Sequence, residues 1–391
     1  MEVQQLKSST SAKLIPVLFG FFVMGFVDVV GVSTSYVKLD FALSDTLANL
    51  LPMIVFVWFA IFSMPVGILM GKIGRKTMVL LSLGVTFASM ILPLIHYSFA
   101  MILLTFALLG VGNTILQVAL NPLLMDVVQK EKATSTLALG YFIKAISSTL
   151  GPVLAGAAAG FFGNWYLIFP VYAAVTLLSY TWLFFTKIGK EELVAQTSQM
   201  SLFDLFKQPG MFMAFTAILL VVGFEISLMT AVPKYLLERC GIPIEQGGLG
   251  CSLYFVARTL GAFLGAILLS RVSVKMFFIV NMFAGIICFV FFMLTASTYV
   301  IFVSLFLVGL FCANVFPIVF SVAIQSDAIR ANEISALMIM GVAGGALLPM
   351  VMGVVADATN QLVSLLIPLL ALIYILFVSF KLHAKFSKKI E

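Results

Sequence analysis

Long runs of apolar residues alternate with short polar loops along the whole chain. Runs long enough to cross about 30 Å of hydrocarbon as helices begin near residues 14, 48, 78, 99, 135, 164, 211, 247, 276, 299, 331 and 361. The pattern therefore predicts an all-α membrane protein with about twelve transmembrane helices. The first run contains Asp28 and lacks a small-residue cleavage site, so we expect it to be a retained span and not a signal peptide.

The longest polar interruption separates the first six runs from the last six. It extends from Lys187 to Gly210. The sequence thus predicts an N-terminal six-helix bundle at residues 1–188, a cytoplasmic linker at 189–210 and a C-terminal six-helix bundle at 211–391.

Several small and polar positions recur between the two halves at offsets of 196 to 199 residues. The pairs are Gly110 with Gly309, Pro152 with Pro349, Gly156 with Gly353, Asn164 with Asn360 and Pro170 with Pro368. Two six-helix repeats with a site between them are typical of secondary transporters. The repeats therefore predict pseudo-symmetric bundles and transport by alternating access.

Composition and charge place the chain in the membrane. Hydrophobic residues make up 62% of the chain and charged residues 10%, and the mean hydropathy is +1.17. Of the 22 Lys and Arg, seventeen lie in loops on one side of the predicted spans, three lie on the other side, and two lie inside spans. Because basic loops remain cytoplasmic, we expect a plasma (inner) membrane protein with both termini in the cytoplasm.

Other classes of protein find no support in the sequence. The chain has no basic patch interleaved with exposed aromatics, so we expect no nucleic-acid partner. Its four cysteines form no C-x-x-C pair, and it has no metal-ligand cluster, nucleotide-binding glycine loop or nucleophile beside a histidine. We therefore expect no enzymatic activity, metal or cofactor, and an ion gradient in place of ATP as the energy source.

Three amides in the fourth span suggest a polar surface inside the bundle. Asn113, Gln117 and Asn121 are spaced four residues apart, which places them on one helix face. Amides donate and accept hydrogen bonds, so this face suits a cavity for hydroxyl-rich ligands. The alternative is that the amides tie neighbouring helices together.

Four charged residues lie inside predicted spans, namely Asp28, Lys144, Glu225 and Arg258. A charge at this depth costs several kcal/mol unless it is paired, hydrated or neutralised. Glycine, serine or tyrosine residues share the helix faces of Asp28, Lys144 and Arg258. We therefore expect these charges to face the bundle interior and to serve function.

These features, together with a basic loop after the second span, resemble the major facilitator superfamily. The loop, Gly67-Ile-Leu-Met-Gly-Lys-Ile-Gly-Arg-Lys76, is similar to the superfamily signature G-x3-D-[RK]-x-G-R-[RK]. The resemblance makes Lys72, Arg75 and Lys76 a gating loop. Gly71 stands where the superfamily has aspartate, so this loop lacks the carboxylate to which the superfamily's gating role is given.

Within the superfamily, the chain resembles the fucose:proton symporter family, which includes glucose, galactose and N-acetylglucosamine permeases. The resemblance rests on the strings Ile115–Pro122 (ILQVALNP) and Pro65–Leu69 (PVGIL), on Gly223-x-Glu225 and on Leu253-Tyr254. It implies a hexose or related monosaccharide as substrate, with Gln117 and Asn121 lining the sugar cavity. The fold commonly works as a monomer in the lipid bilayer.

The resemblance also pairs the buried charges. First and fifth helices are neighbours in this fold, so Asp28 is expected to pair with Lys144, and Glu225 with Arg258 in the other half. A proton or Na⁺ on Asp28 or Glu225 would release the basic partner and couple ion binding to sugar binding. The alternative is a static salt bridge that fixes helix packing.

Positions that depart from the family pattern leave the substrate open. Tyr141 and Lys144 stand where the family has glutamine and asparagine, and Arg258 lies one helical turn before the family's arginine position, Ala262. Asp28 lies a turn before the family's Asn-Asp pair. The positive charge of Lys144 favours an alternative substrate, an acidic sugar such as a uronate or sialic acid.

Three further residues complete the set of expected sugar contacts. Trp58 in the second span and Tyr141 either stack on a pyranose ring or pack between helices. Asn314, an amide in the tenth span, is also expected to contact the sugar. The string from Gly151 through Pro152 to Gly156 resembles a motif of efflux antiporters, so a proton-driven exporter of amphipathic compounds is a second alternative.

Overall fold

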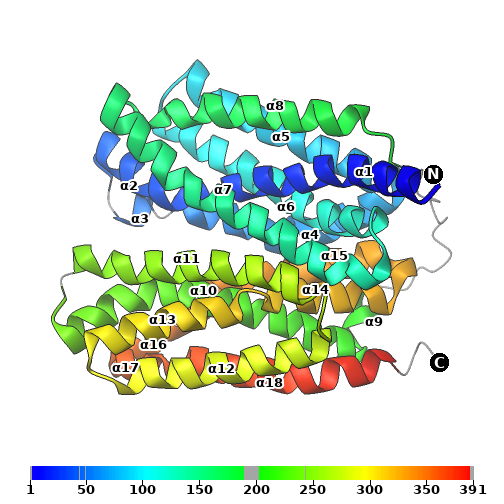
Figure 1. Ribbon diagram of the computed structural model, residues 1–391. Coiled ribbons are helices and arrows are strands. Elements are labelled where there is room, and N and C mark those ends of the chain that lie inside the picture. The colour runs from blue at the N-terminus through cyan, green and yellow to red at the C-terminus, as the bar shows by residue number, and fades with distance from the viewer. Residues whose placement is uncertain (1, 44, 49, 189–201, 243, 388–391) are drawn as a thin grey trace. The chain divides into compact units, whose positions relative to one another are not determined.

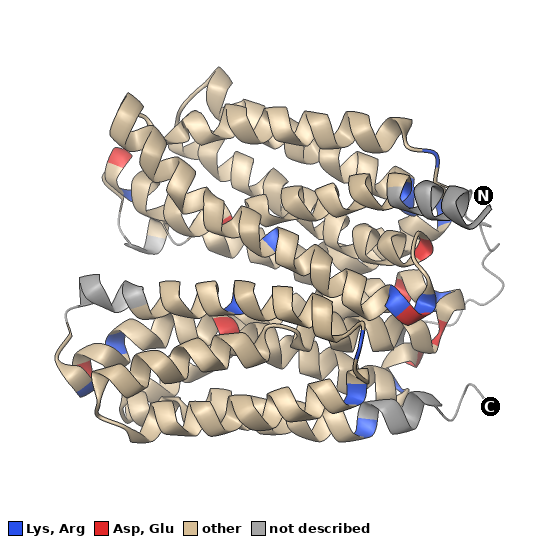
Figure 2. Cartoon of the chain, viewed as in Figure 1, with Lys and Arg blue, Asp and Glu red and all other residues tan. Residues whose placement is uncertain are grey.

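The computed structural model describes residues 2–43, 45–48, 50–188, 202–242 and 244–387 (Figure 1). Every regular element in these residues is helical, and twelve helical segments are long and apolar enough to cross a membrane. The prediction of an all-α protein with twelve membrane-spanning helices is confirmed. Figure 2 shows that acidic and basic residues gather toward the ends of the helices, with few along their length.

The chain forms two compact units. Unit 1 comprises Met1–Ala133, Ile143–Gln199 and Ile329–Met340. Its helices are α1 (Glu2–Met24), η1 (Gly25–Val29), α2 (Val30–Asp40), α3 (Asp45–Ala48), α4 (Leu50–Ile73), α5 (Arg75–Ile95), α6 (Phe99–Asp126), η2 (Lys130–Lys132), most of α7 (Ala133–Phe162), η3 (Trp165–Leu167), α8 (Ile168–Phe185) and α15 (Ala331–Met340).

Unit 2 comprises Thr134–Phe142, Met200–Ala328 and Gly341–Glu391. Its helices are α9 (Leu202–Phe206), α10 (Pro209–Cys240), α11 (Ile244–Leu268), α12 (Val274–Leu294), α13 (Thr298–Cys312), α14 (Val315–Ser326), η5 (Gly341–Ala343), α16 (Gly344–Ala358), α17 (Gln361–Ser364) and α18 (Leu366–Ser387). The short helix η4 (Ala328–Arg330) lies at the boundary between the units. Of the predicted linker, residues 189–201 lie outside the described part of the chain.

The units follow the predicted halves except at two exchanged segments, Thr134–Phe142 and Ile329–Met340. Side-chain packing explains the difference. In unit 1 the hydroxyl of Ser335 on α15 donates to the carbonyl of Val118 on α6 at 2.6 Å. In unit 2 the hydroxyls of Thr134 and Ser321 lie 2.7 Å apart.

The same glycine crossing occurs in both units and confirms the internal repeat. A Cβ on Gly25 would lie 2.6 Å from the carbonyl oxygen of Lys144, so only glycine lets the first span pass this close to α7. A Cβ on Gly223, 198 residues later, would lie 2.9 Å from the carbonyl oxygen of Gly344 on α16. The first and fifth spans of each half therefore meet backbone to backbone.

Several of the described spans are discontinuous, three of them well inside the span. The first span changes to a 3₁₀ segment at Gly25–Val29, the tenth breaks between α13 and α14, and the eleventh contains η5. Broken helices free backbone groups for ligands and mark the sites of many transporters. Two expected site residues lie at such breaks, Asp28 within η1 and Asn314 at the start of α14.

Candidate functional site

The three amides of α6 form a buried hydrogen-bonded ladder. The Nδ2 of Asn113 donates to the carbonyl of Met24 at 2.8 Å, at the end of α1. The Nε2 of Gln117 donates to Oδ1 of Asn113 at 2.7 Å, and Nδ2 of Asn121 donates to the carbonyl of Gln117 at 2.9 Å. Asn113 thus ties α6 to the break in the first span, as the helix-tying interpretation expects.

The ladder leaves one polar atom of Gln117 available. Its Nε2 is used, whereas its Oε1 accepts no hydrogen bond from the described part of the chain. A carbonyl oxygen of this kind can accept from a sugar hydroxyl. Gln117 is therefore the member of the stripe whose geometry suits ligand binding best.

Asp28 lies against two residues of α7. The Nζ of Lys144 is 4.0 Å from Oδ2 of Asp28, and the hydroxyl of Ser148 donates to the same oxygen at 2.5 Å. The Asp28 side chain is 40% exposed and that of Lys144 is 18% exposed. This is a loose ion pair with an accessible carboxylate.

Glu225 and Arg258 form a tighter pair in unit 2. The Nε of Arg258 on α11 lies 2.9 Å from Oε1 of Glu225 on α10, and the carboxylate side chain is 13% exposed. The structure therefore brings together both expected pairs. They differ in distance, in exposure and in which helix supplies the base.

The remaining residues expected to contact the sugar belong to different units and have different neighbours. Trp58 packs its ring against Gly110, and its buried Nε1 has no hydrogen-bond partner among the described residues. The Nδ2 of Asn314 donates to the carbonyl of Gly261 at 2.7 Å. Tyr141 belongs to unit 2, where its ring lies 5.0 Å from that of Phe316, whereas Lys144 belongs to unit 1.

The predicted gating loop connects α4 and α5. Arg75 donates to Oδ1 of Asn332 at 2.8 Å and forms an ion pair with Asp126. The Nζ of Lys76 donates to the carbonyl of Thr186 at 2.8 Å, and Lys72 is exposed. Arg75 thus finds a carboxylate on α6, so its charge is compensated although the loop itself lacks the usual aspartate.

An aromatic cluster joins three loop ends on the other side of unit 1. Asp40 accepts hydrogen bonds from the hydroxyl of Tyr97 and, at 2.8 Å, from Nε1 of Trp165. Burial and the neighbouring Asp40 carboxylate raise the pKa of Tyr97 above its usual range. Tyr36 stacks on Trp165 with ring centroids 5.4 Å apart. Because its polar groups bond to one another, the cluster serves as a structural tie.

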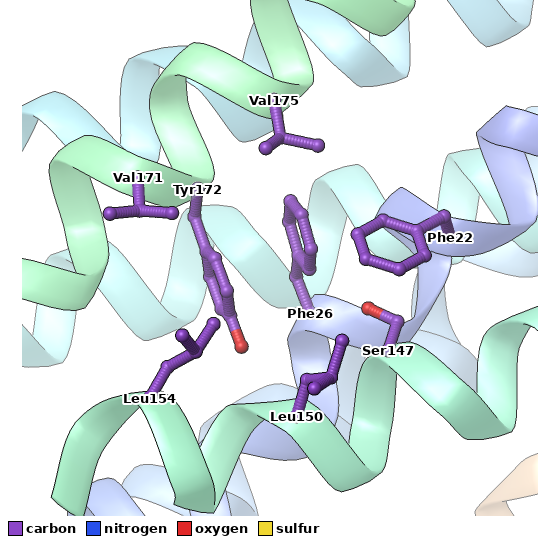
Figure 3. A pocket seen from close by; sticks show the side chains of 8 residues that line it. All are labelled: Phe22, Phe26, Ser147, Leu150, Leu154, Val171, Tyr172 and Val175. Atoms are coloured by element: carbon purple, nitrogen blue, oxygen red, sulfur yellow. The ribbon is translucent and has the colours of Figure 1, made fainter. Parts of the chain in front are cut away.

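A small cavity of about 130 Å³ lies between the first span, α7 and α8, beside Ser147 (Figure 3). Its lining is apolar apart from two hydroxyls, and the rings of Phe26 and Tyr172 stack at 3.8 Å. The lining residues are Phe22, Phe26, Ser147, Leu150, Leu154, Val171, Tyr172 and Val175. With no charge or amide in its wall, this cavity does not suit a sugar.

Sequence reasoning missed Ser148. Its signal was present, because Ser148 lies four residues after Lys144 and therefore on the same face of one helix. Among the described residues, no group of three or more His, Cys, Asp or Glu side chains could hold a metal ion.

Comparison with known proteins agrees with this architecture. The chain is 23% identical over 376 residues to a glucose/galactose transporter of Brucella abortus biovar 1 (strain 9-941), covering 91% of this chain and 90% of that one. It is 26% identical over 392 residues to a putative glucose/galactose transporter of Helicobacter pylori (strain J99), covering 92% of this chain and 94% of the relative.

Solved structures share the fold. A variant of the E. coli fucose:proton symporter FucP superposes with a TM-score of 0.84 at 18% identity, covering 95% of this chain and 99% of that one. An outward-facing bacterial homologue of the iron transporter ferroportin gives a TM-score of 0.73 at 17% identity, with the same coverage. The family model described as Major Facilitator Superfamily matches residues 17–326. With twelve apolar helices in two repeats and this match over most of its length, the chain belongs to the Major Facilitator Superfamily and is a multi-pass membrane transporter, not an enzyme.

Proposed function

We propose that the protein is a secondary active transporter that carries a hexose or related monosaccharide together with an ion by alternating access. The observation that carries the proposal is the accessible Asp28 carboxylate, 4.0 Å from Lys144 at a break in the first span. The named glucose/galactose transporters among its relatives, and its fold likeness to a fucose:proton symporter, support a sugar as the substrate.

Coupling follows from competition for Asp28. While the carboxylate is charged, it compensates Lys144. When an ion neutralises Asp28, Lys144 loses its counter-charge and needs another acceptor, such as a sugar oxygen. Ion and sugar therefore favour the same state of the site, which is the thermodynamic requirement for symport.

The geometry favours H⁺ over Na⁺ as the coupling ion. A Na⁺ ion beside Asp28 or Glu225 would meet a basic group whose nitrogen lies within 4.0 Å of the carboxylate, and like charges at such a distance repel. A proton neutralises the carboxylate through a covalent bond and needs no coordination shell.

For sugar recognition, we propose that Gln117 provides the acceptor, with Trp58 and Asn314 as further contacts. The support for this set is the free acceptor atom of Gln117 and the buried, unpartnered atoms of the other two residues within the described chain. We propose Asn113, Asn121 and Tyr141 as further members of this set, although the Nδ2 atoms of Asn113 and Asn121 already donate within the ladder of α6.

A second candidate substrate is an acidic sugar. The 4.0 Å separation from Asp28 leaves the Lys144 ammonium without a close carboxylate, so the carboxylate of a uronate could bind it. Lys144→Gln should then abolish transport of the acid while leaving the protein folded.

The charge distribution supports a location in the plasma (inner) membrane with both termini cytoplasmic. We propose that the protein acts as a monomer, because each unit contains its own charge pair.

The test is uptake of labelled glucose into proteoliposomes under an inward H⁺ gradient, an inward Na⁺ gradient or neither. We expect accumulation under the H⁺ gradient alone. Accumulation only with Na⁺ would overturn the choice of ion, and uptake of a labelled uronate in place of glucose would establish the second candidate. Absence of uptake of both sugars would contradict sugar symport.

A further inference from the structure

The hydroxyl of Ser148 has two acceptors within hydrogen-bond distance. It lies 2.5 Å from Oδ2 of Asp28 and 2.9 Å from the carbonyl oxygen of Lys144, one turn earlier on α7. A serine hydroxyl carries one hydrogen, so it donates fully to only one of these oxygens at a time. The position of that hydrogen therefore depends on the state of Asp28.

Both protonation states of Asp28 can be satisfied by this arrangement. When the carboxylate is charged, Ser148 donates to it. When the carboxyl is protonated, its O–H donates to the Ser148 oxygen, and the serine hydrogen turns to the carbonyl of Lys144. No polar group loses its partner in the exchange.

Few other groups act on Asp28. Among the described residues, Lys144 from α7 and Tyr172 from α8 are the titratable side chains that face it, and Asn113 of α6 is neutral and bonded elsewhere. Lys144 is too distant to donate a hydrogen bond at 4.0 Å. Ser148 is thus the hydrogen-bond donor to Asp28 in the described chain.

The acidic residue of the charge pair in unit 2 has a different kind of partner. Glu225 forms a close ion pair with its basic partner, with Nε of Arg258 2.9 Å from its Oε1. Asp28 receives its hydrogen bond from a neutral hydroxyl that can reverse direction. The Asp28 site thus combines an accessible carboxylate with a partner that accommodates both protonation states.

We propose that Ser148 is a positioning residue for proton coupling, which sets the affinity of Asp28 for the proton by holding the carboxylate and then reversing its hydrogen bond. This proposal rests on the proposed function, in which Asp28 is the coupling group. Ser148 itself neither gains nor loses a proton overall, because it donates one hydrogen bond in each state.

The test compares the pH dependence of sugar uptake in Ser148→Ala, Ser148→Thr and wild-type proteoliposomes. Ser148→Ala removes a hydrogen bond from both states of Asp28, and the bond to the charged carboxylate is the stronger of the two, so protonation becomes easier and the midpoint of uptake should move upward by about one pH unit. Ser148→Thr retains the hydroxyl and should restore the wild-type midpoint. The matched control is Thr149→Ala, because the Thr149 hydroxyl bonds to the carbonyl of Ala145 and is exposed.

A second readout does not depend on sugar. Infrared titration of the protonated carboxyl band, assigned by its loss in Asp28→Asn, should show the same upward shift in Ser148→Ala. If this variant fails to fold, Ser148→Cys, a weaker donor, should shift the band in the same direction. An unchanged band midpoint would overturn the role of Ser148. A shifted band without proton-driven uptake in the wild type would instead overturn the proposed function.

Discussion

Asp28 carries its charge at a helix break, held by one hydroxyl and faced by one ammonium. Its carboxylate is 40% exposed, whereas that of Glu225 is 13% exposed and directly bonded to Arg258. A buried, well-bonded pair resists neutralisation, because the partner would be left as an uncompensated charge. Asp28 and Glu225 occupy similar positions in the first and seventh spans, but their carboxylates therefore have different environments.

Asp28→Asn should abolish concentrative uptake while preserving exchange of sugar across the membrane. Asparagine is neutral at all relevant pH values, so the site cannot gain or release a proton. Uptake driven by the H⁺ gradient should fall to the level seen without a gradient, whereas counterflow of labelled against unlabelled sugar should continue. The control is Asp204→Asn, which removes the exposed pair between Asp204 on α9 and Lys207 just after it. Continued accumulation in Asp28→Asn would show that another group couples transport.

Gln117 and Asn113 should respond differently to the same substitution. Gln117→Leu removes the proposed sugar acceptor. The loss of one hydrogen bond worth about 1 kcal/mol should raise the KM for sugar about five- to tenfold. Asn113→Leu removes the bond to the Met24 carbonyl and should lower the melting temperature. Melting curves and uptake kinetics on both variants separate the roles. Equal losses of stability in the two variants would assign Gln117 to helix tying alone.

At the scale of elements, glycines decide how near the spans approach one another. A Cβ on Gly344 would overlap the carbonyl oxygen of Leu219, so α16 and α10 cross backbone against backbone. In unit 1, Gly25 likewise allows the first span to approach the backbone of α7 closely, one turn before Asp28. The crossing thus fixes the position of the helix break that carries the carboxylate.

Gly344→Ala should destabilise the protein, whereas Gly353→Ala, on the same helix, should not. The added methyl at position 344 forces a backbone shift that costs about 1–3 kcal/mol or more. No atom lies within 4 Å of a Cβ at position 353, and alanine is the better helix former. Thermal unfolding in detergent measures the difference. Equal melting temperatures would mean that α16 shifts away from α10 without cost.

At the scale of the whole molecule, the compact units differ from the sequence halves at two segments. The start of α7 belongs to unit 2 and α15 belongs to unit 1. Each exchanged segment is bonded within its unit to a span of the other sequence half, Thr134 of the fifth span to Ser321 of the tenth and Ser335 of the eleventh span to Val118 of the fourth. Rocking of the two sequence halves against one another in alternating access would therefore require these bonds to break.

A disulfide between Thr134→Cys and Ser321→Cys should stop transport. The two hydroxyls lie 2.7 Å apart, which is close enough for replacement by a disulfide. The oxidised double variant should bind sugar without transporting it, and reduction should restore uptake. Each single cysteine variant serves as the control, because the protein has native free cysteines. Full uptake by the oxidised protein would show that this contact persists through the cycle.

The sequence by itself determined the twelve spans, the membrane setting, the repeat and the identity of the charged residues inside the spans. These features depend on local hydropathy and on recurring residue types, which are readable along the chain. The four-residue spacing also placed three amides on one face of α6, as the ladder of Asn113, Gln117 and Asn121 shows.

Only the tertiary structure decided what these groups bond to. The spacing of the amides could not distinguish a ligand cavity from a tie to Met24, and the sequence did not reveal that Ser148 holds Asp28. Nor did chain order reveal that Thr134 and Ser335 pack in exchanged units. The physical reason is that partners are set by helix crossings between residues far apart in the chain, and close glycine contacts fix those crossings.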